Sequence, residues 1–254
     1  MILRAPGTNC DVETAYAFTM AGAKAEVLHI NRILETPNLL TEFQILCLPG
    51  GFSYGDDVAA GRILGNQIRH HLFQSLHEFR EAGKLILGIC NGFQILIKSG
   101  VLLDQAAKSP GSSATLTWND SGKFEDRWVQ LAVHNQKSPF LSGIEGMYLP
   151  VAHAEGKFVA CDEATLQHMD DSGQLVLRYA NLDPVDGSVP YPSNPNGSQR
   201  SVAGVCDTTG RVLGLMPHPE RNIDRVHHPR WTRGEGGEVG DGLAMFKNAI
   251  AYFR

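Results

Sequence analysis

The sequence predicts an α/β protein built on a mostly parallel, doubly wound sheet. Up to Gly100, short apolar runs alternate with segments of helical periodicity. That alternation is typical of parallel strands joined by right-handed crossovers. Two of the apolar runs end in turns rich in glycine, and functional loops of such folds gather at the carboxyl ends of the strands.

The elements of the first part follow in chain order. Ile2-Leu3 forms a short strand, and Thr8 or Asn9 can cap a helix that runs to about Met20. Strand-like apolar runs follow at 25–30, 43–48 and 84–89. Apolar residues at helical spacing predict one helix over 61–82 and another from Phe93 onward.

After Gly100 the predicted strands are shorter and alternate with polar loops. They cover 115–118, 128–133, 147–151, 175–179, 201–206 and 211–216, and the last two pair across the turn 207–210. The segment 183–198 is rich in Pro, Asn and Gly and is expected to be an exposed loop. A final helix covers 241–253. Because no repeat or linker is visible, residues 1–254 are expected to form a single domain.

Composition excludes several classes of function. Hydrophobic residues make up 43% and charged residues 19%, as in ordinary soluble proteins. The formal charge of −5 offers no basic footprint for nucleic acid, and no signal peptide or membrane span is visible. The five cysteines contain no C-x-x-C pair, and Cys47 and Cys206 are expected in the core. A reducing, cytoplasmic location is therefore expected.

The segment Gly88-Ile-Cys90-Asn-Gly92 is the strongest motif of the chain. It lies between a buried strand and a helix, which is the nucleophile-elbow pattern with cysteine as the nucleophile. At a helix N-terminus the dipole and free N–H groups favour the thiolate, the reactive form. A small buried cysteine in an ordinary strand–turn–helix is the alternative.

A thiol nucleophile needs a base, and the best candidate is in Met216-Pro-His-Pro-Glu-Arg221. Pro219 pushes His218 toward an extended conformation, in which residues two apart point to the same side. Glu220 can then accept a hydrogen bond from the imidazole and stabilise its charged form. A turn that exposes both side chains is an equal alternative.

Other residues could complete such a site. Backbone N–H groups of Gly50, Gly51 and Asn91 could stabilise an oxyanion, although Gly-Gly also suits a plain tight turn. Gln94 lies one helical turn after Cys90 and could bind a polar substrate. His153 and Glu155 follow an apolar run and could line the same pocket, or simply form a loop at a strand end.

Phosphate and metal sites have weaker support. The chain contains no Gly-x-x-x-x-Gly-Lys-[Ser/Thr] motif, no H-E-x-x-H motif and no Cys/His cluster with ligand spacing. The pairs His70-His71 and His227-His228 rarely point at one ion, and Asp56-Asp57 suits a loop cap better than a Mg²⁺ site. No metal site is expected.

The elbow Gly88–Gln94 and His218-Pro-Glu220 together resemble the class I, Cys-His-Glu, glutamine amidotransferases. Three further segments are similar to the glutaminase subunits of phosphoribosylformylglycinamidine synthases: 6–11, 48–56 and 216–221. The resemblance covers most of the chain in order. Ala154 departs from it, since the family typically has glycine there, and the segment 222–240 is longer than in compact members.

The resemblance implies a flavodoxin-like three-layer α/β/α sandwich that hydrolyses glutamine through a Cys thioester. Cys90 would be the nucleophile, His218 the base and Glu220 its partner. Gly50 or Gly51, with Asn91, would form the oxyanion hole, and Phe52, Gln94, His153 and Glu155 would bind glutamine. Ammonia would pass to a large synthase subunit, with or without a small accessory subunit, that converts formylglycinamide ribonucleotide to its amidine. That partner would supply ATP and Mg²⁺, and this chain would hold no cofactor.

Three rival functions remain at this point. The partner could be an anthranilate, GMP or CTP synthase, although the segments 6–9 and 52–56 argue against it. The chain could be a stand-alone cysteine hydrolase of the related DJ-1/PfpI kind. It could also be a subunit that only binds a partner, which an intact triad disfavours.

Overall fold

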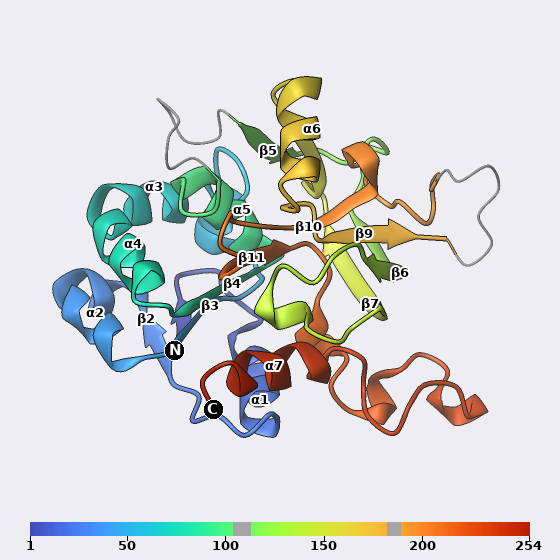
Figure 1. Ribbon diagram of the computed structural model, residues 1–254, viewed down its shortest axis with the longest axis horizontal. Helices are drawn as coiled ribbons and strands as arrows, with labels where there is room; N and C mark the ends of the chain where they lie inside the picture. Colours follow the sequence, from blue (N-terminus) through green and yellow to red (C-terminus); the bar gives the residue numbers. More distant parts are fainter. Residues whose placement is uncertain (104–112, 182–188) are drawn as a thin grey trace.

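The computed structural model describes residues 1–103, 113–181 and 189–254 (Figure 1). Their core is a nine-stranded sheet of order β2-β1-β3-β4-β11-β10-β9-β6-β7, beside a two-stranded sheet of β5 (Ala114–Thr117) and β8 (Lys157–Ala160). Apolar side chains at the contacts between the large sheet and its helices form a buried core. The predicted α/β class is confirmed.

One half of the large sheet is parallel, as predicted. It contains β2 (Val27–His29), β1 (Ile2–Arg4), β3 (Ile45–Leu48), β4 (Leu85–Ile89) and β11 (Val212–Leu215). The middle strands β3 and β4 are almost entirely apolar and buried, as expected of parallel strands covered on both faces.

The other half is antiparallel, so the expectation of a mostly parallel sheet is only partly right. Strands β10 (Val202–Cys206), β9 (Leu177–Ala180), β6 (Glu125–Val133) and β7 (Gly146–His153) each run antiparallel to their neighbours. Short connections such as that between β10 and β11 permit only antiparallel pairing. The predicted pairing across 207–210 is confirmed.

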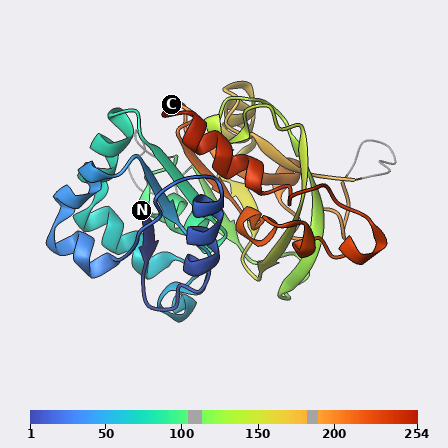
Figure 2. The same cartoon turned by 90° about the horizontal axis from the view of Figure 1, so that it is seen from below.

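Helices cover both faces of the parallel half. Figure 1 shows α3 (Arg62–His71), α4 (Phe73–Glu81) and α5 (Asn91–Ser99) on one side. Helices α1 (Asp11–Met20) and α7 (Leu243–Ala251) pack side by side on the other, as Figure 2 also shows. The remaining α2 (Ile30–Glu35) follows β2, and α6 (Glu163–Asp171) lies near β8. The three layers predicted for the fold are present in this half.

Several local predictions need correction. The predicted helix over 61–82 is two helices, because Leu72 leaves the helical conformation with φ −124° and ψ −1°. The N-cap residue of helix α1 is Cys10, not the predicted Thr8 or Asn9. The sequence reasoning missed β8 (Lys157–Ala160) and α6. Residues 183–188 of the predicted loop 183–198 lie outside the described residues. Residues 189–198 form turns and irregular backbone.

No helix in the described ranges is both long enough and apolar enough to span a bilayer.

Candidate active site

The topology brings four chain segments to one edge of the sheet. Strands β1, β3, β4 and β11 are parallel neighbours, so their carboxyl ends lie next to one another. Register supports this, since Leu48 pairs with Gly88 and Ile89 pairs with Leu215. The residues that follow these ends are Cys10, the Gly50-Gly51 turn, Cys90 and His218. Strand order thus brings together the predicted Gly50-Gly51 turn, Cys90 and His218, which lie far apart in the sequence, and adds Cys10 to them.

Cys90 occupies a strained turn between β4 and α5. Its φ is 51° and its ψ −105°, an unfavourable combination for a residue with a Cβ. Three backbone hydrogen bonds hold the turn: Cys90 N–H donates to Leu215 O at 2.8 Å, and Cys90 O accepts from Phe93 N at 3.0 Å and from Gln94 N at 3.2 Å. Such strain is typical of a nucleophile elbow, which presents the side chain at the tip of the turn. The predicted strand–turn–helix is confirmed.

The two glycines of the motif are required by close packing. A Cβ on Gly88 would lie 2.5 Å from Leu96 Cδ1, and a Cβ on Gly92 would lie 1.9 Å from the carbonyl oxygen of Leu48. Helix α5 therefore approaches strand β3 more closely than any larger residue allows. That approach fixes the start of the helix under Cys90.

We expect Gly92→Ala to lower the free energy of unfolding by more than about 2 kcal/mol, because the added methyl group overlaps backbone that cannot move aside easily. Urea denaturation followed by circular dichroism measures the change. Gly237→Ala is the control, since its Cβ would meet its nearest neighbour, Val239 O, at 3.3 Å. Equal losses in the two variants would contradict the packing argument.

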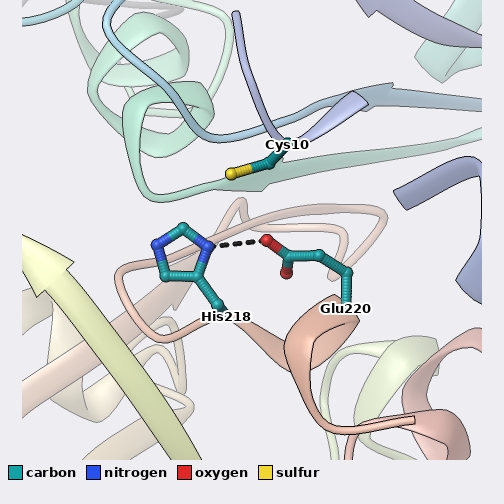
Figure 3. Close-up of side chains that lie close together, drawn as sticks. All are labelled: Cys10, His218 and Glu220. Carbon is teal, nitrogen blue, oxygen red and sulfur yellow. Dashed lines mark hydrogen bonds and ion pairs between the residues drawn. The ribbon is translucent and has the colours of Figure 1, made fainter. Parts of the chain in front are cut away.

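His218 and Glu220 form a buried hydrogen-bonded pair (Figure 3). His218 Nδ1 lies 2.6 Å from Glu220 Oε1, and the two residues are 2% and 1% exposed. Pro219 and Glu220 lie in a short 3₁₀ turn that begins after His218. His218 N–H donates to Pro150 O at 2.9 Å, which ties the segment to β7. The predicted contact between imidazole and carboxylate is therefore present.

The surroundings of His218 favour its charged form. Burial by itself would lower the pKa of the imidazole, but the negative charge of Glu220, then the thiols of Cys90 and Cys10, outweigh it and raise that pKa well above its usual value. Among the described residues, His218 Nε2 has no hydrogen-bond partner. The ring can thus keep a proton while its second nitrogen stays available to a reacting group near Cys90.

Cys10 is a site residue that sequence reasoning did not single out. Its sulfur, a ring nitrogen of His218 and a carboxylate oxygen of Glu220 all lie within 4.8 Å of one another (Figure 3). The sequence carried two signals: the place of Cys10 just after the first strand, at the start of a helix, and its position within the family-like segment 6–11. The first signal becomes informative only once β1 is known to lie beside β3 in the sheet.

Cys10, His218 and Glu220 also offer the donor types that bind transition metals. Two of the three, however, already bond to each other, since Nδ1 and Oε1 are 2.6 Å apart. Zinc between them would need bonds of about 2.0–2.2 Å to each and would have to break that hydrogen bond. The arrangement therefore suits proton transfer better than metal binding.

The Gly50-Gly51 turn places its two residues differently. A Cβ on Gly50 would lie 2.8 Å from His218 Cε1 and 3.1 Å from Cys10 Sγ, so Gly50 makes room for the imidazole. Gly51, with φ +140°, lines a small cavity beside Cys90. Of the two, Gly51 is the better placed to face a bound substrate.

The cavity beside Cys90 is small, with a volume of about 40 Å³. The predicted substrate residues Phe52, Gln94, His153 and Glu155 all line it. Phe52 is 46% exposed at its mouth, and the other three are buried or half-buried. The thiol of Cys90 lies 3.6 Å from the carbonyl oxygen of Ala152, at the opposite wall. The nucleophile and the predicted binding residues thus share one cavity.

Polar side chains at the start of α5 are tied into a network. Asn91 Nδ2 donates to Gln94 Oε1 at 2.9 Å and to Asp56 Oδ1 at 3.0 Å, and Asn91 Oδ1 accepts from Ser53 N. Gln94 Nε2 donates to the carbonyl of Glu155 at 2.7 Å. The amide of Gln94 therefore holds the cavity wall in place, while the Asn91 backbone stays at the N-terminus of the helix.

His153 is held as a neutral ring with a fixed tautomer. Asn119 Nδ2 donates to two carbonyls, so its Oδ1 is the acceptor for His153 Nδ1, 3.1 Å away. The proton is therefore on Nδ1, and Nε2, which has no partner among the described residues, is an acceptor. Burial, followed by the charge of His218, lowers the pKa of His153 to about 3.

This environment predicts a pH dependence of stability. Below pH 6.5 the unfolded chain protonates His153, whereas the folded chain does not until about pH 3, so stability falls as the pH falls. Between pH 7 and pH 5, we expect wild type to lose about 2 kcal/mol more unfolding free energy than His153→Gln. Urea denaturation at pH 7 and pH 5 measures the two losses. Equal losses in wild type and His153→Gln would contradict a buried, neutral His153.

Comparisons with known proteins agree with this geometry. A family model for the CobB/CobQ-like glutamine amidotransferase domain matches residues 1–253. A phosphoribosylformylglycinamidine synthase subunit PurQ from Dehalococcoides mccartyi is 47% identical over 255 residues, 100% of this chain and 97% of the relative. A subunit of the same name from Methanococcus maripaludis is 37% identical, covering 100% and 96%. The solved structure of PurLQS from Thermotoga maritima contains a chain with a TM-score of 0.73 and 32% identity, covering 100% and 97%.

Proposed function

This chain belongs to the CobB/CobQ-like glutamine amidotransferase family, and on that premise we propose that it is the glutaminase subunit of a phosphoribosylformylglycinamidine synthase. It hydrolyses glutamine to glutamate and ammonia. The ammonia passes to a partner synthase, which uses ATP to convert formylglycinamide ribonucleotide to formylglycinamidine ribonucleotide in purine biosynthesis. The observation that carries the proposal is Cys90, held on a strained turn beside the buried His218–Glu220 pair.

The reaction begins with the thiolate of Cys90. The N-terminus of α5 and the imidazolium of His218 both favour negative charge on this sulfur. The sulfur attacks the side-chain carbonyl carbon of glutamine, and the carbonyl oxygen becomes an oxyanion. Backbone N–H groups of Gly51 and Asn91 stabilise it, because they lie on the turn and helix start that flank Cys90.

His218 carries the protons in both halves of the reaction. It donates from Nε2 to the leaving nitrogen, the C–N bond breaks, and ammonia departs from a Cys90 thioester. A water molecule then gives a proton to Nε2 as it attacks the thioester, and glutamate leaves with the sulfur restored. Glu220 keeps Nδ1 protonated throughout and stabilises the positive ring.

The cavity has groups suited to the rest of the substrate. His153 Nε2 is a neutral acceptor in its wall and can receive an N–H of glutamine. Glu155 adds a carboxylate, already bound to Ala60 N at 3.3 Å and lying 3.9 Å from Lys98. Phe52 covers the mouth. Substitution of these residues would raise KM more than it lowers kcat.

The partner contributes everything that ammonia requires after release. Free ammonia becomes protonated in bulk water and loses its nucleophilicity, so direct transfer to the synthase is needed. ATP and Mg²⁺ belong to that partner, and this chain binds neither. Residues 1–254 act as one amidotransferase domain in the cytoplasm, in a complex with the large synthase subunit and a small accessory subunit.

Glutamate release tests the proposal. The chain is assayed alone, with its large and small partner chains, and with those chains plus ATP and formylglycinamide ribonucleotide. We expect little release from the isolated chain, a strong increase in the full mixture, and covalent labelling of Cys90 by a glutamine-analogue diazoketone. Partner-independent turnover, or peptide hydrolysis without glutamine hydrolysis, would overturn it.

A further inference from the structure

The environment of Cys10 connects it to the catalytic base. Cys10 is 1% exposed, and its thiol forms two hydrogen bonds: Sγ donates to Asn9 Oδ1 at 3.2 Å and accepts from Arg221 Nη2 at 3.1 Å. Arg221 in turn lies 3.6 Å from Glu13. The sulfur is therefore held from two sides by groups that belong to the fold.

The backbone of Cys10 is equally fixed. Its N–H donates to Gly50 O at 3.2 Å, and its carbonyl accepts from Thr14 N at 3.1 Å and Thr14 Oγ1 at 2.6 Å. Strand end, glycine turn and helix α1 are thereby joined at this residue. The Cα of Cys10 therefore cannot move without disturbing all three.

The sulfur of Cys10 and the imidazole of His218 both pack against Gly50, at a point where a side chain would not fit. The missing Cβ of Gly50 would contact both His218 Cε1, at 2.8 Å, and Cys10 Sγ, at 3.1 Å. Figure 3 shows the thiol directed toward the ring, while Glu220 approaches Nδ1 from another side. The hydrogen bond to Glu220 restrains the ring at Nδ1, and the sulfur of Cys10 lies at another part of the ring. A neighbour at that position restricts rotation of the ring.

Cys10 must also remain a neutral thiol. A second thiolate would compete with Cys90 for the positive charge of His218. Burial raises the pKa of Cys10, although the nearby His218 and Arg221 act against this. The S–H donor bond to Asn9 Oδ1 favours the same neutral form.

We propose that Cys10 is a positioning residue, whose thiol, held by Asn9 and Arg221, keeps the imidazole of His218 aimed at Cys90. Cys10 is not among the described residues that line the cavity beside Cys90. Its effect should therefore appear in kcat rather than in KM.

The charged and titratable groups around the imidazole of His218, besides Cys10, are Glu220, Cys90, Arg221 and His153. This inference rests on the proposed function.

The test compares Cys10→Ala, Cys10→Ser and the control Cys206→Ala in the complex with the synthase. Cys206 is an equally buried thiol on β10, bonded to Gly173 O at 3.9 Å. For Cys10→Ala we expect kcat for glutamate release to fall about tenfold, with KM changed less than about twofold, because a base displaced by a fraction of an ångström loses rate and not binding.

A second readout separates positioning from a general structural effect. Alkylation of Cys90 by iodoacetamide, followed by mass spectrometry across pH, reports its thiolate. We expect the midpoint of the pH dependence of Cys90 alkylation to rise by about one pH unit in Cys10→Ala, because a displaced imidazolium stabilises the thiolate less. Cys10→Ser keeps partners for Asn9 and Arg221 and should lie between Ala and wild type in both readouts.

A fall in kcat without a shift of the midpoint, an equal fall in Cys206→Ala, or a serine variant no better than alanine would overturn the role of Cys10. Alkylation needs no glutamine turnover. A wild-type complex that releases no glutamate would therefore refute the proposed function, while the midpoint still decides whether Cys10 positions His218.

Discussion

Cys90→Ser is expected to reduce glutamine-dependent glutamate release by at least about 10⁴-fold, because loss of a covalent nucleophile removes the whole two-step route. Serine is nearly isosteric, but its hydroxyl does not ionise beside His218 as a thiol does. The synthase in the same complex should still form its product when ammonia is supplied directly. Parallel assays with glutamine and with ammonium chloride at high pH measure both activities.

The matched control for this experiment is Cys161→Ser. Cys161 is an exposed free thiol just after β8; it contacts Thr165 Oγ1 at 3.2 Å and does not line the cavity beside Cys90. It should retain both activities. Loss of the ammonia-dependent reaction in Cys90→Ser would indicate a damaged interface instead of a missing nucleophile. Retention of glutamine turnover in that variant would refute the thioester mechanism.

The nucleophile could be predicted from sequence because its signals are local. The turn at Cys90 needs glycine on both sides, and the reason is visible at Gly88 and Gly92, where a Cβ would overlap Leu96 or Leu48. Apolar runs on either side also identify the buried strand and the helix. The contact between His218 and Glu220 was also predicted from local sequence, but its premise was wrong: Pro219–Arg221 form a 3₁₀ turn, not an extended segment, and this turn brings the two side chains together.

Other features depended on topology and could not be read from the chain. Cys10 reaches His218 only because β1 lies beside β3, a pairing that follows from the order of the whole sheet. The antiparallel half was underestimated because its strands are short, and pattern alone does not reveal their direction. The break at Leu72 carries no Gly or Pro signal, and Leu72 is buried there, so tertiary packing decides it.

Some predicted roles are refined by the geometry. Gln94 was expected to face the substrate, and it does line the cavity, but its amide is occupied by Asn91 and the Glu155 carbonyl. Gly50 or Gly51 was expected to be an oxyanion donor, and the close packing of Gly50 against His218 favours Gly51 for that role. Sequence spacing identifies the face on which a residue lies. Hydrogen-bond partners then decide what that residue is free to do.

The buried charge of Glu220 predicts the second large effect. Glu220→Gln keeps size and hydrogen-bonding capacity but removes the negative charge that stabilises the His218 imidazolium. Without it, burial dominates and the pKa of His218 falls, so less of the Cys90–His218 pair is in the charged form. We expect kcat for glutamate release to fall about 10⁴-fold, the loss seen when the acid of a Ser-His-Asp triad is neutralised.

The pH profile distinguishes this loss of charge from a loss of folding. The optimum of the residual Glu220→Gln activity should shift, because the base now titrates at lower pH, while circular dichroism remains that of the wild type. Asp207→Asn is the control: this carboxylate is also 1% exposed but lies in the turn before β11, at the opposite end from His218. It should lose stability and keep turnover within about twofold. Equal turnover losses in the two variants would show that any buried carboxylate matters equally, and wild-type turnover in Glu220→Gln would show that His218 needs no counter-charge.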